Sequence, residues 1–172
     1  MSCSQTLGGI PSDCSTSRGG ILEAWIGNHA DVASKELTDE IITKITLAEG
    51  AAKLQHYSFK RGTGSMTSTL NTDAANGVRF VATELALVFA RMDTAKRVEM
   101  DKLSGGDLVA IVKDANGKYW YLGYDEPVTA TAGTGQTGTA NTDGNNYQIT
   151  LTDNSDTYPH EVSAEALADI VD

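Results

Sequence analysis

Alternating apolar and polar residues are the main pattern along this chain. Residues 21–26 place Ile21, Glu23 and Trp25 on one face and Leu22, Ala24 and Ile26 on the other, as a β-strand does. Residues 41–47 and 54–59 alternate in the same way and contain β-branched or aromatic side chains. Turn residues separate these short segments, so the pattern predicts an antiparallel sheet.

Two hairpins follow from the same pattern. In residues 108–122, Leu108, Ala110 and Val112 alternate with Val109 and Ile111, and the sequence DANG at 114–117 tolerates the positive φ of a tight turn. The other hairpin is more polar. It combines an exposed edge strand in residues 61–73 with a strand that begins after Asn76-Gly77 and includes VRFVATELALVFA. Within this second strand, residues 84–92 also fit a helical period, so the sequence leaves their state open.

Capped helices are predicted at two places. Asp93 or Thr94 can cap a helix that runs to about residue 103, where Ser104-Gly105-Gly106 ends it. A narrow apolar stripe on this segment predicts that the helix packs beside the sheet, with Glu99 paired to Lys102 or Lys96 on its wet side. A short final helix can follow Ser163.

Glycine-rich sequence occurs at two positions. Residues 1–20 predict an N-terminal arm, followed by one domain in residues 21–172. The tract TATAGTGQTGTANTDGNN, residues 129–146, predicts a long loop between two strands, the second of which begins near Tyr147. A loop longer than about 12 to 15 residues in a compact domain is usually functional or disordered. Its threonines favour extended chain and its glycines remove rigidity, so we expect either an arm that orders on a neighbouring subunit or a mobile surface loop.

Composition supports one globular domain with an acidic surface. The chain has 172 residues, of which 40% are hydrophobic and 21% charged, and its formal net charge is −10. This charge argues against a protein that binds nucleic acid through a basic face. The sequence contains neither an apolar run near the roughly 20 residues of a membrane helix nor a signal peptide, so we expect a soluble protein made in the cytoplasm. Cys3 and Cys14 can stay reduced or close a small disulfide loop.

A search for chemistry finds little. The three histidines lie in unrelated contexts, and the GTGS and GTGQTG segments lack the lysine of a phosphate-binding loop. Calcium binding by the acidic segments 143–146 or 152–156 is an alternative, although neither fits an EF-hand. We therefore expect no catalytic residue, cofactor or metal, and the residues indicate a structural or binding protein of mainly β structure.

The order of elements from the helix in RMDTAKRVEMDKLSGGD through KDANGKYWYLGYDEP to GTGQTGTANTDGNNYQITLTD resembles tail tube and related virion proteins of tailed bacteriophages, over about residues 21–165. The resemblance implies an antiparallel β-sandwich or barrel-like domain with one flanking helix, a long hairpin and extended inter-subunit loops. It further implies hexameric rings that stack into the tail tube, together with other tail or neck proteins of the virion. Such a tube is assembled in the host cytoplasm, contacts no membrane, and lets DNA pass through its lumen without specific binding. An acidic lumen would repel DNA phosphates.

The hypothetical subunit interface combines the polar edge hairpin with the Gly/Thr tract. Its candidate residues are Arg61, Gly62, Ser65, Met66, Thr67, Thr69, Leu70, Thr131, Gly133, Gly135, Gln136 and Gly138.

Three alternatives stay open. One is a head-tail connector or neck ring of the virion. Another is a carbohydrate- or cell-surface-binding β-sandwich that uses Trp25, Trp120 and several tyrosines. The third is an enzyme that uses Asp125 and Glu126.

Overall fold

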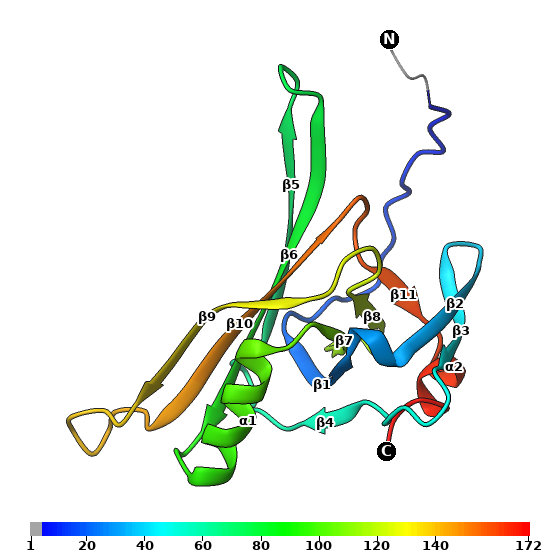
Figure 1. Cartoon of the computed structure of the whole chain (residues 1–172). Coiled ribbons are helices and arrows are strands. Elements are labelled where there is room, and N and C mark those ends of the chain that lie inside the picture. The colour runs from blue at the N-terminus through cyan, green and yellow to red at the C-terminus, as the bar shows by residue number, and fades with distance from the viewer. Residues whose placement is uncertain (1–4) are drawn as a thin grey trace.

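Two β-sheets packed face to face form the body of the protein in the computed structural model, which describes residues 5–172 (Figure 1). The structure is 49% strand and 12% helix, and its sheets do not close into a barrel. The expected mainly β, sandwich-like fold with a flanking helix is therefore confirmed, in its open form.

The larger sheet has seven strands in the order β2-β3-β11-β8-β7-β1-β4, and the smaller sheet has four in the order β5-β6-β10-β9. The bounds in the larger sheet are β1 Ile21–Asn28, β2 Val32–Thr38, β3 Ile41–Leu47, β4 Gln55–Tyr57, β7 Leu108–Asp114, β8 Tyr119–Leu122 and β11 His160–Val162. In the smaller sheet they are β5 Ser65–Asp73, β6 Val78–Ala90, β9 Thr129–Gln136 and β10 Asn146–Ser155. The helices are α1 Thr94–Gly105 and α2 Ala164–Ala168, with a 3-10 turn η1 at His29–Asp31.

Strand β7 is buried on both faces and separates two apolar cores. Leu108, Ala110 and Val112 enter the core between the sheets, where they meet Leu85, Leu87, Ile149 and Leu151 of the smaller sheet. Val109 and Ile111 enter a second core on the opposite face of the larger sheet, which α2 covers. A strand with both faces covered reads as a continuous apolar run, and this accounts for the sequence LVAIV.

The predicted faces of β1 are partly wrong. Its pairing with β7 shifts register between Ile21 and Glu23, which marks a bulge. Because a bulge adds one residue to a strand, Ile21 joins Ala24 and Ile26 in the inter-sheet core, and Trp25 enters the second core. Leu22 is left half exposed.

The open question about residues 84–92 is decided in favour of a strand. Strand β6 runs to Ala90 and pairs with β10 over ten residue pairs, from Asn146↔Ala90 to Ser155↔Val81. Leu85, Leu87 and Phe89 are buried at every second position, which is the period of a strand. Pairing with β10 therefore overrides the helical period of this segment.

Both predicted helices are present, with their predicted caps. The Asp93 carboxylate accepts a hydrogen bond from the Lys96 amide at 2.8 Å, and the Ser163 hydroxyl accepts one from the Ala166 amide at 3.2 Å. Glu99 pairs with Lys102 at 2.7 Å, whereas Lys96 pairs with Asp93. Within residues 5–172, no helix is long and apolar enough to cross a membrane.

The prediction of a long loop at 129–146 is wrong for its first half, which is a strand. Residues 129–136 form strand β9, which pairs with β10 from Thr152↔Thr129 to Asn146↔Gln136. The connection to β10 is residues 137–145 and turns through Gly138, whose φ is +72°. The threonine-rich half pairs because β10 offers an unpaired edge beside it. The pattern also missed β2 and β11, whose pairing with β3 is set by the fold.

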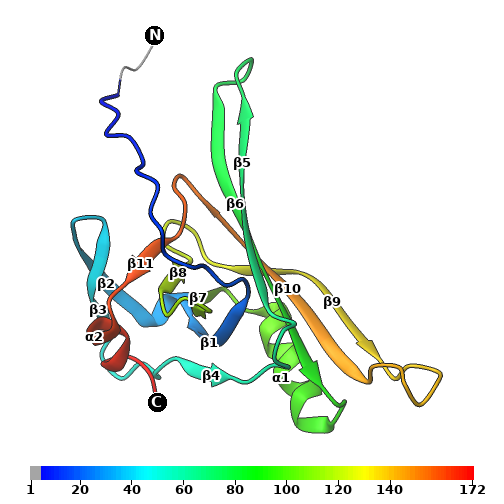
Figure 2. The ribbon, with the colours of Figure 1, turned by 180° about the vertical axis from the view of Figure 1, so that it is seen from behind.

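The described part of the N-terminal arm, residues 5–19, contains neither helix nor strand, and all its residues are exposed. It leaves the body at the start of β1 (Figures 1 and 2). Asn116, in the β7–β8 turn, accepts a hydrogen bond from the Arg18 amide at 2.9 Å and donates one to the Arg18 carbonyl at 3.1 Å. These bonds fix the base of the arm. Cys14 is exposed, and Cys3 lies outside the described residues, as does any pairing between them.

Candidate assembly surface

The residues predicted for a subunit interface lie at the two opposite edges of the smaller sheet. Ser65, Met66, Thr67, Thr69 and Leu70 belong to the edge strand β5. At the other edge, β9 contains Thr131, Gly133, Gly135 and Gln136. Arg61 and Gly62 lie in the turn that leads to β5, and Gly138 lies in the β9–β10 turn. The fold thus brings two distant segments into one sheet without bringing them into contact.

The β5–β6 hairpin projects from the body as a two-stranded ribbon (Figure 1). The pairing of β6 with β10 ends at Val81, whereas β5 and β6 continue to Asp73↔Val78. At the tip, the Asp73 carboxylate accepts hydrogen bonds from the Asn76 side chain at 2.6 Å and from the Ala75 amide at 3.0 Å. These bonds lower the pKa of Asp73, with the Asn76 side chain as the largest cause. Leu70 and Val78 are 43% and 44% exposed, so the ribbon presents apolar side chains to solvent.

The face of the smaller sheet that points away from the core is mostly polar. Alternation along the paired strands places mainly small or uncharged side chains there, with Phe80 opposite Asn71. Its central positions are Ser65, Thr67, Thr69, Asn71, Phe80, Ala82, Glu84, Ala86, Val88, Gln148, Thr150, Thr152 and Asn154. Glu84 is the only charged residue among these positions, and none of them is Lys or Arg. We call this surface the polar sheet face.

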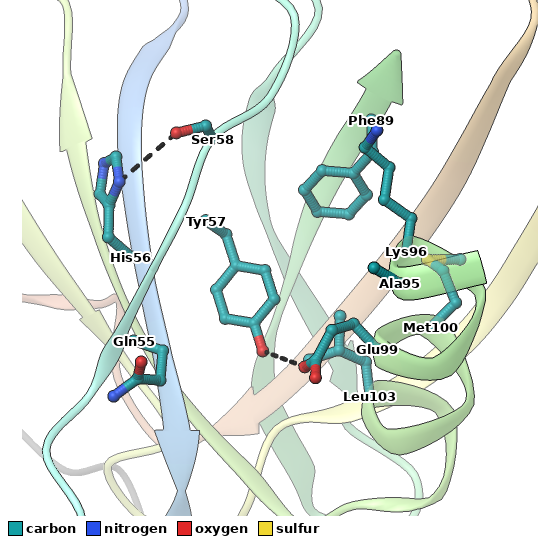
Figure 3. Close-up of a pocket in the computed structure, with 10 residues that line it drawn as sticks. All are labelled: Gln55, His56, Tyr57, Ser58, Phe89, Ala95, Lys96, Glu99, Met100 and Leu103. Carbon is teal, nitrogen blue, oxygen red and sulfur yellow. Dashed lines mark hydrogen bonds between the residues drawn. The ribbon is translucent and has the colours of Figure 1, made fainter. Parts of the chain in front are cut away.

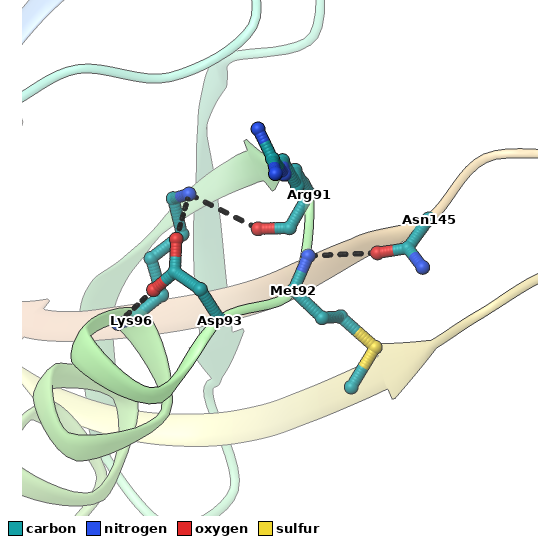
Figure 4. Close-up of polar contacts among 5 residues, drawn as sticks. All are labelled: Arg91, Met92, Asp93, Lys96 and Asn145. Atoms are coloured by element: carbon teal, nitrogen blue, oxygen red, sulfur yellow. Dashed lines mark hydrogen bonds and ion pairs between the residues drawn. The ribbon is translucent and has the colours of Figure 1, made fainter.

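The connection from β6 to α1 is tied to the β9–β10 connection at Asn145, next to the start of β10 (Figure 4). Asn145 accepts two hydrogen bonds of 2.7 Å, through its carbonyl oxygen from the Arg91 amide and through its side chain from the Met92 amide. The Lys96 ammonium donates to the Arg91 carbonyl at 3.0 Å and pairs with Asp93 at 2.6 Å. Arg91 has a φ of +64°, a conformation uncommon for a residue with a side chain. These contacts hold α1 against β9 and β10.

A groove of about 360 Å³ opens between β4 and α1 (Figure 3). We call it the β4/α1 groove. Phe89, Met100 and Leu103 provide apolar walls, and Gln55, His56, Ser58, Ala95 and Lys96 complete the lining. Inside the groove the Tyr57 hydroxyl donates to the Glu99 carboxylate at 3.2 Å. Burial, followed by the charge of Glu99, raises the pKa of Tyr57 to about 12.

Sequence reasoning missed this groove. Tyr57 and Glu99 are 42 positions apart, and no local motif connects them. The amphipathic stripe of α1 indicated that the helix packs on the sheet, but it did not show that Ala95 and Met100 leave a gap beside β4.

A second polar region lies around Asp153 at the end of β10. Asp153 and Tyr121 are each only 1% exposed, and the Asp153 Oδ1 atom and the Tyr121 hydroxyl have no hydrogen-bond partner among the described residues. Burial is the main cause that raises the pKa of Asp153, and the charges of Asp125 and Glu126 add to it.

Asp125 itself accepts hydrogen bonds from the Ser155 hydroxyl at 2.8 Å and the Asp156 amide at 2.9 Å, which lower its pKa. This bonding connects the loop after β8 to the end of β10, a structural use of the carboxylate considered for catalysis.

The aromatic residues considered for carbohydrate binding are mostly inside the protein. Trp25 is 8% exposed, Tyr121 is 1% exposed, and the Trp120 indole donates to Asp114 at 3.0 Å while its ring packs against the inter-sheet core. Tyr124 stacks on His160 with 4.6 Å between ring centroids, beneath the Lys35 ammonium. These contacts assign the aromatic rings to packing.

Residues 5–172 contain no cluster of three or more His, Cys, Asp or Glu side chains arranged to hold a metal ion. The two acidic segments considered for calcium serve as turn and strand, with Asp143 capping the amides of Thr139 and Ala140 at 2.8 and 2.7 Å. No protein-family model matches the chain, and neither a curated protein nor a solved structure matches it.

Proposed function

We propose that this protein is a structural subunit that assembles with copies of itself into rings, and that the rings stack into the tail tube of a bacteriophage. The observation that carries the proposal is the difference between the edges of the two sheets. Single-domain proteins protect exposed edges with short strands, lysine, proline or bulges, because an unprotected edge recruits another strand.

The edges of the larger sheet follow this rule. At one edge, β2 carries Lys35 and Glu36, and at the other β4 is only three residues long. The edges of the smaller sheet follow it only in part, because the pairing of β9 with β10 shifts register between Thr150 and Leu151, which marks a bulge, while the other protections are missing. Strand β5 has nine residues and β9 has eight, and neither contains lysine, arginine or proline. Asp73, at the far end of β5, is their only charged residue.

Two different edges on one sheet, both long and without lysine or proline, suit a head-to-tail contact. The β5 edge of one copy can pair with the β9 edge of the next, and such a heterologous contact closes into a ring when the rotation between copies allows it. The sheet would then continue from subunit to subunit. The projecting hairpin would extend the paired length and cover Leu70 and Val78, which a single copy leaves exposed.

The polar sheet face suits the inside of such a ring. It offers no Lys or Arg to bind a phosphate, and its one central charge, Glu84, repels phosphates. A polyanion could pass along a wall of Thr, Ser, Ala and Asn without adhering. If this face lines the lumen, Glu84 is the acidic residue at its centre, because most of the other acidic residues of the chain lie outside this face.

Assembly of the full-length protein tests the proposal. We expect light scattering after size exclusion to give multiples of the 18.2 kDa chain, and negative-stain electron microscopy to show rings or tubes. Six-fold rings that stack indicate a tail tube, whereas isolated twelve-fold rings indicate a connector. A monodisperse monomer across a wide concentration range refutes ring assembly.

A variant of the β5 edge tests whether assembly depends on strand pairing at that edge. Thr67→Lys with Thr69→Lys places two charges on the exposed β5 edge and should abolish rings without unfolding the chain. The matched control is Thr43→Lys with Thr46→Lys. It makes the same chemical change at two exposed threonines of β3, a strand that already has neighbours on both sides. Rings that survive the β5 change, or disappear equally in both variants, contradict pairing through the β5 edge.

A further inference from the structure

This chain has an exposed apolar pair on its arm and a groove with apolar walls on its body. On the arm, Leu7 is 90% and Ile10 is 98% exposed, the two most exposed large hydrophobic side chains of the described residues. On the body, the β4/α1 groove is lined by Met100, which is partly buried, and by Phe89 and Leu103, which are 7% and 3% exposed. Surface hydrophobic residues occur singly in many proteins, but an apolar pair on an extended arm, in a chain that also has a groove with apolar walls, requires an account.

The arm is built to reach outward. Between Leu7 and Ile10 lie Gly8 and Gly9, and a Cβ added at either would meet nothing within 4 Å. The two apolar side chains are three positions apart, about 10 Å in extended chain. From its fixed base at Arg18, the arm spans about 26 to 29 Å to Ile10 when extended.

The groove of the same chain is not where the arm points. The arm runs away from the body on the side opposite β4 and α1, and Figures 1 and 2 agree on this. The only side-chain hydrogen bonds between the described arm and the body are at its base, where Ser17 and Arg18 meet Asn116. A second copy can instead supply the side chains that fill the β4/α1 groove.

The groove also adjoins the edge proposed for assembly. Met100 lines the groove and, with Ala130, Gly133 and Ile149, a smaller hollow under β9. A segment seated in the groove would therefore continue the surface that the β9 edge forms with a neighbouring subunit.

We propose that Leu7 and Ile10 of one copy occupy the β4/α1 groove of another copy, so that the arm acts as an apolar latch between subunits. The latch rests on the proposed self-assembly and adds a contact separate from edge pairing. Glycines at positions 8 and 9 let both side chains turn toward the groove, and the arm becomes ordered only on its partner.

Cross-linking of the full-length chain tests the latch. In a Cys3→Ser, Cys14→Ser background, Gly8→Cys places a thiol between the two apolar arm residues, and Ser58→Cys places one at the groove. Mild oxidation should give a ladder of covalent multimers on a denaturing gel. The control replaces Ser58→Cys by Thr43→Cys, an exposed position of β3 outside the groove lining, and should give little ladder. A monomer with an internal link means that the arm folds onto its own groove, and this outcome overturns the proposal, as does equal cross-linking in the control.

Two further changes separate the latch from edge pairing. Leu7→Ser with Ile10→Ser removes the apolar side chains and should lower the ladder yield roughly ten- to a hundred-fold, as expected for loss of buried aliphatic groups. Ala95→Trp fills the groove from an exposed position at the start of α1 and should do the same, whereas Ala164→Trp, at the start of α2, should not. Circular dichroism checks that each variant is folded. If the unaltered chain forms rings but yields no ladder, the latch is refuted and ring assembly stands; if it forms neither, both are refuted.

Discussion

Two glycines in β9 allow a sharp test of how tightly this edge is packed. A Cβ added at Gly135 would lie 2.8 Å from Cε1 and 3.0 Å from Cδ1 of Tyr147, and 3.3 Å from the Met92 methyl. A Cβ at Gly133 would lie 3.6 Å from the Gln148 carbonyl oxygen and 3.8 Å from the Met100 methyl, which is ordinary contact. The two positions are on the same strand and are both exposed, so they form a matched pair.

The expected magnitudes have opposite signs. Replacing a strand glycine by alanine gains up to about 1 kcal/mol from reduced freedom of the unfolded chain. At Gly135 the Tyr147 ring must move, and overpacking of this kind costs about 1 to 3 kcal/mol. We therefore expect Gly135→Ala to lower the free energy of unfolding by about 1 to 2 kcal/mol, and Gly133→Ala to leave it unchanged or raise it by less than about 1 kcal/mol.

Urea denaturation followed by circular dichroism measures both values. The Tyr147→Leu background removes the ring that obstructs position 135, so the cost of Gly135→Ala should shrink there, while the effect of Gly133→Ala should not change. Equal effects of the two alanines in the unaltered protein, or an undiminished Gly135→Ala cost in the Tyr147→Leu background, would refute the packing argument.

Three further predictions concern titration and capping. Because the pKa of Tyr57 is raised to about 12 from an unfolded value near 10, its contribution to stability is present below pH 10 and is lost as the pH rises toward 12. Tyr57→Phe should therefore weaken the loss of stability measured by urea midpoints between pH 10 and pH 12. An unchanged pH profile in the variant refutes the raised pKa. Asp153 also has a raised pKa, so its charged form is unfavourable in the folded state; Asp153→Asn should raise stability at pH 7 relative to the unaltered protein, with the gap closing as the pH falls, and a less stable variant at pH 7 contradicts the assignment. Ser163→Ala removes the cap at the Ala166 amide and should cost about 1 kcal/mol, a fall of about 2 to 4 °C in Tm by calorimetry, whereas no change means that the cap is not formed in solution.

Local pattern determined much of this fold. The alternation of residues 108–112, the turn at 114–117 and the caps at Asp93 and Ser163 each depend on neighbours a few positions away, and the structure contains all of them. The polar character of residues 65–73 also predicted an edge strand, because a strand with no apolar face cannot lie inside a sandwich.

Tertiary structure decided the features that depend on pairing between distant segments. Residues 84–92 became a strand as far as Ala90, and residues 129–136 a strand rather than loop, because β10 lies between them and satisfies the backbone of both. The bulge that turns Ile21 into the inter-sheet core arises from its register with β7, which no local period contains.

The sequence by itself thus determined a mainly β domain with capped helices, an exposed arm and two polar segments rich in threonine and glycine. Only the tertiary structure placed those two segments on opposite edges of one sheet, and opened a groove where β4 and α1 meet. The physical reason is that periodicity records which side of a segment is buried, whereas hydrogen bonds between strands far apart in sequence decide which segment lies beside it.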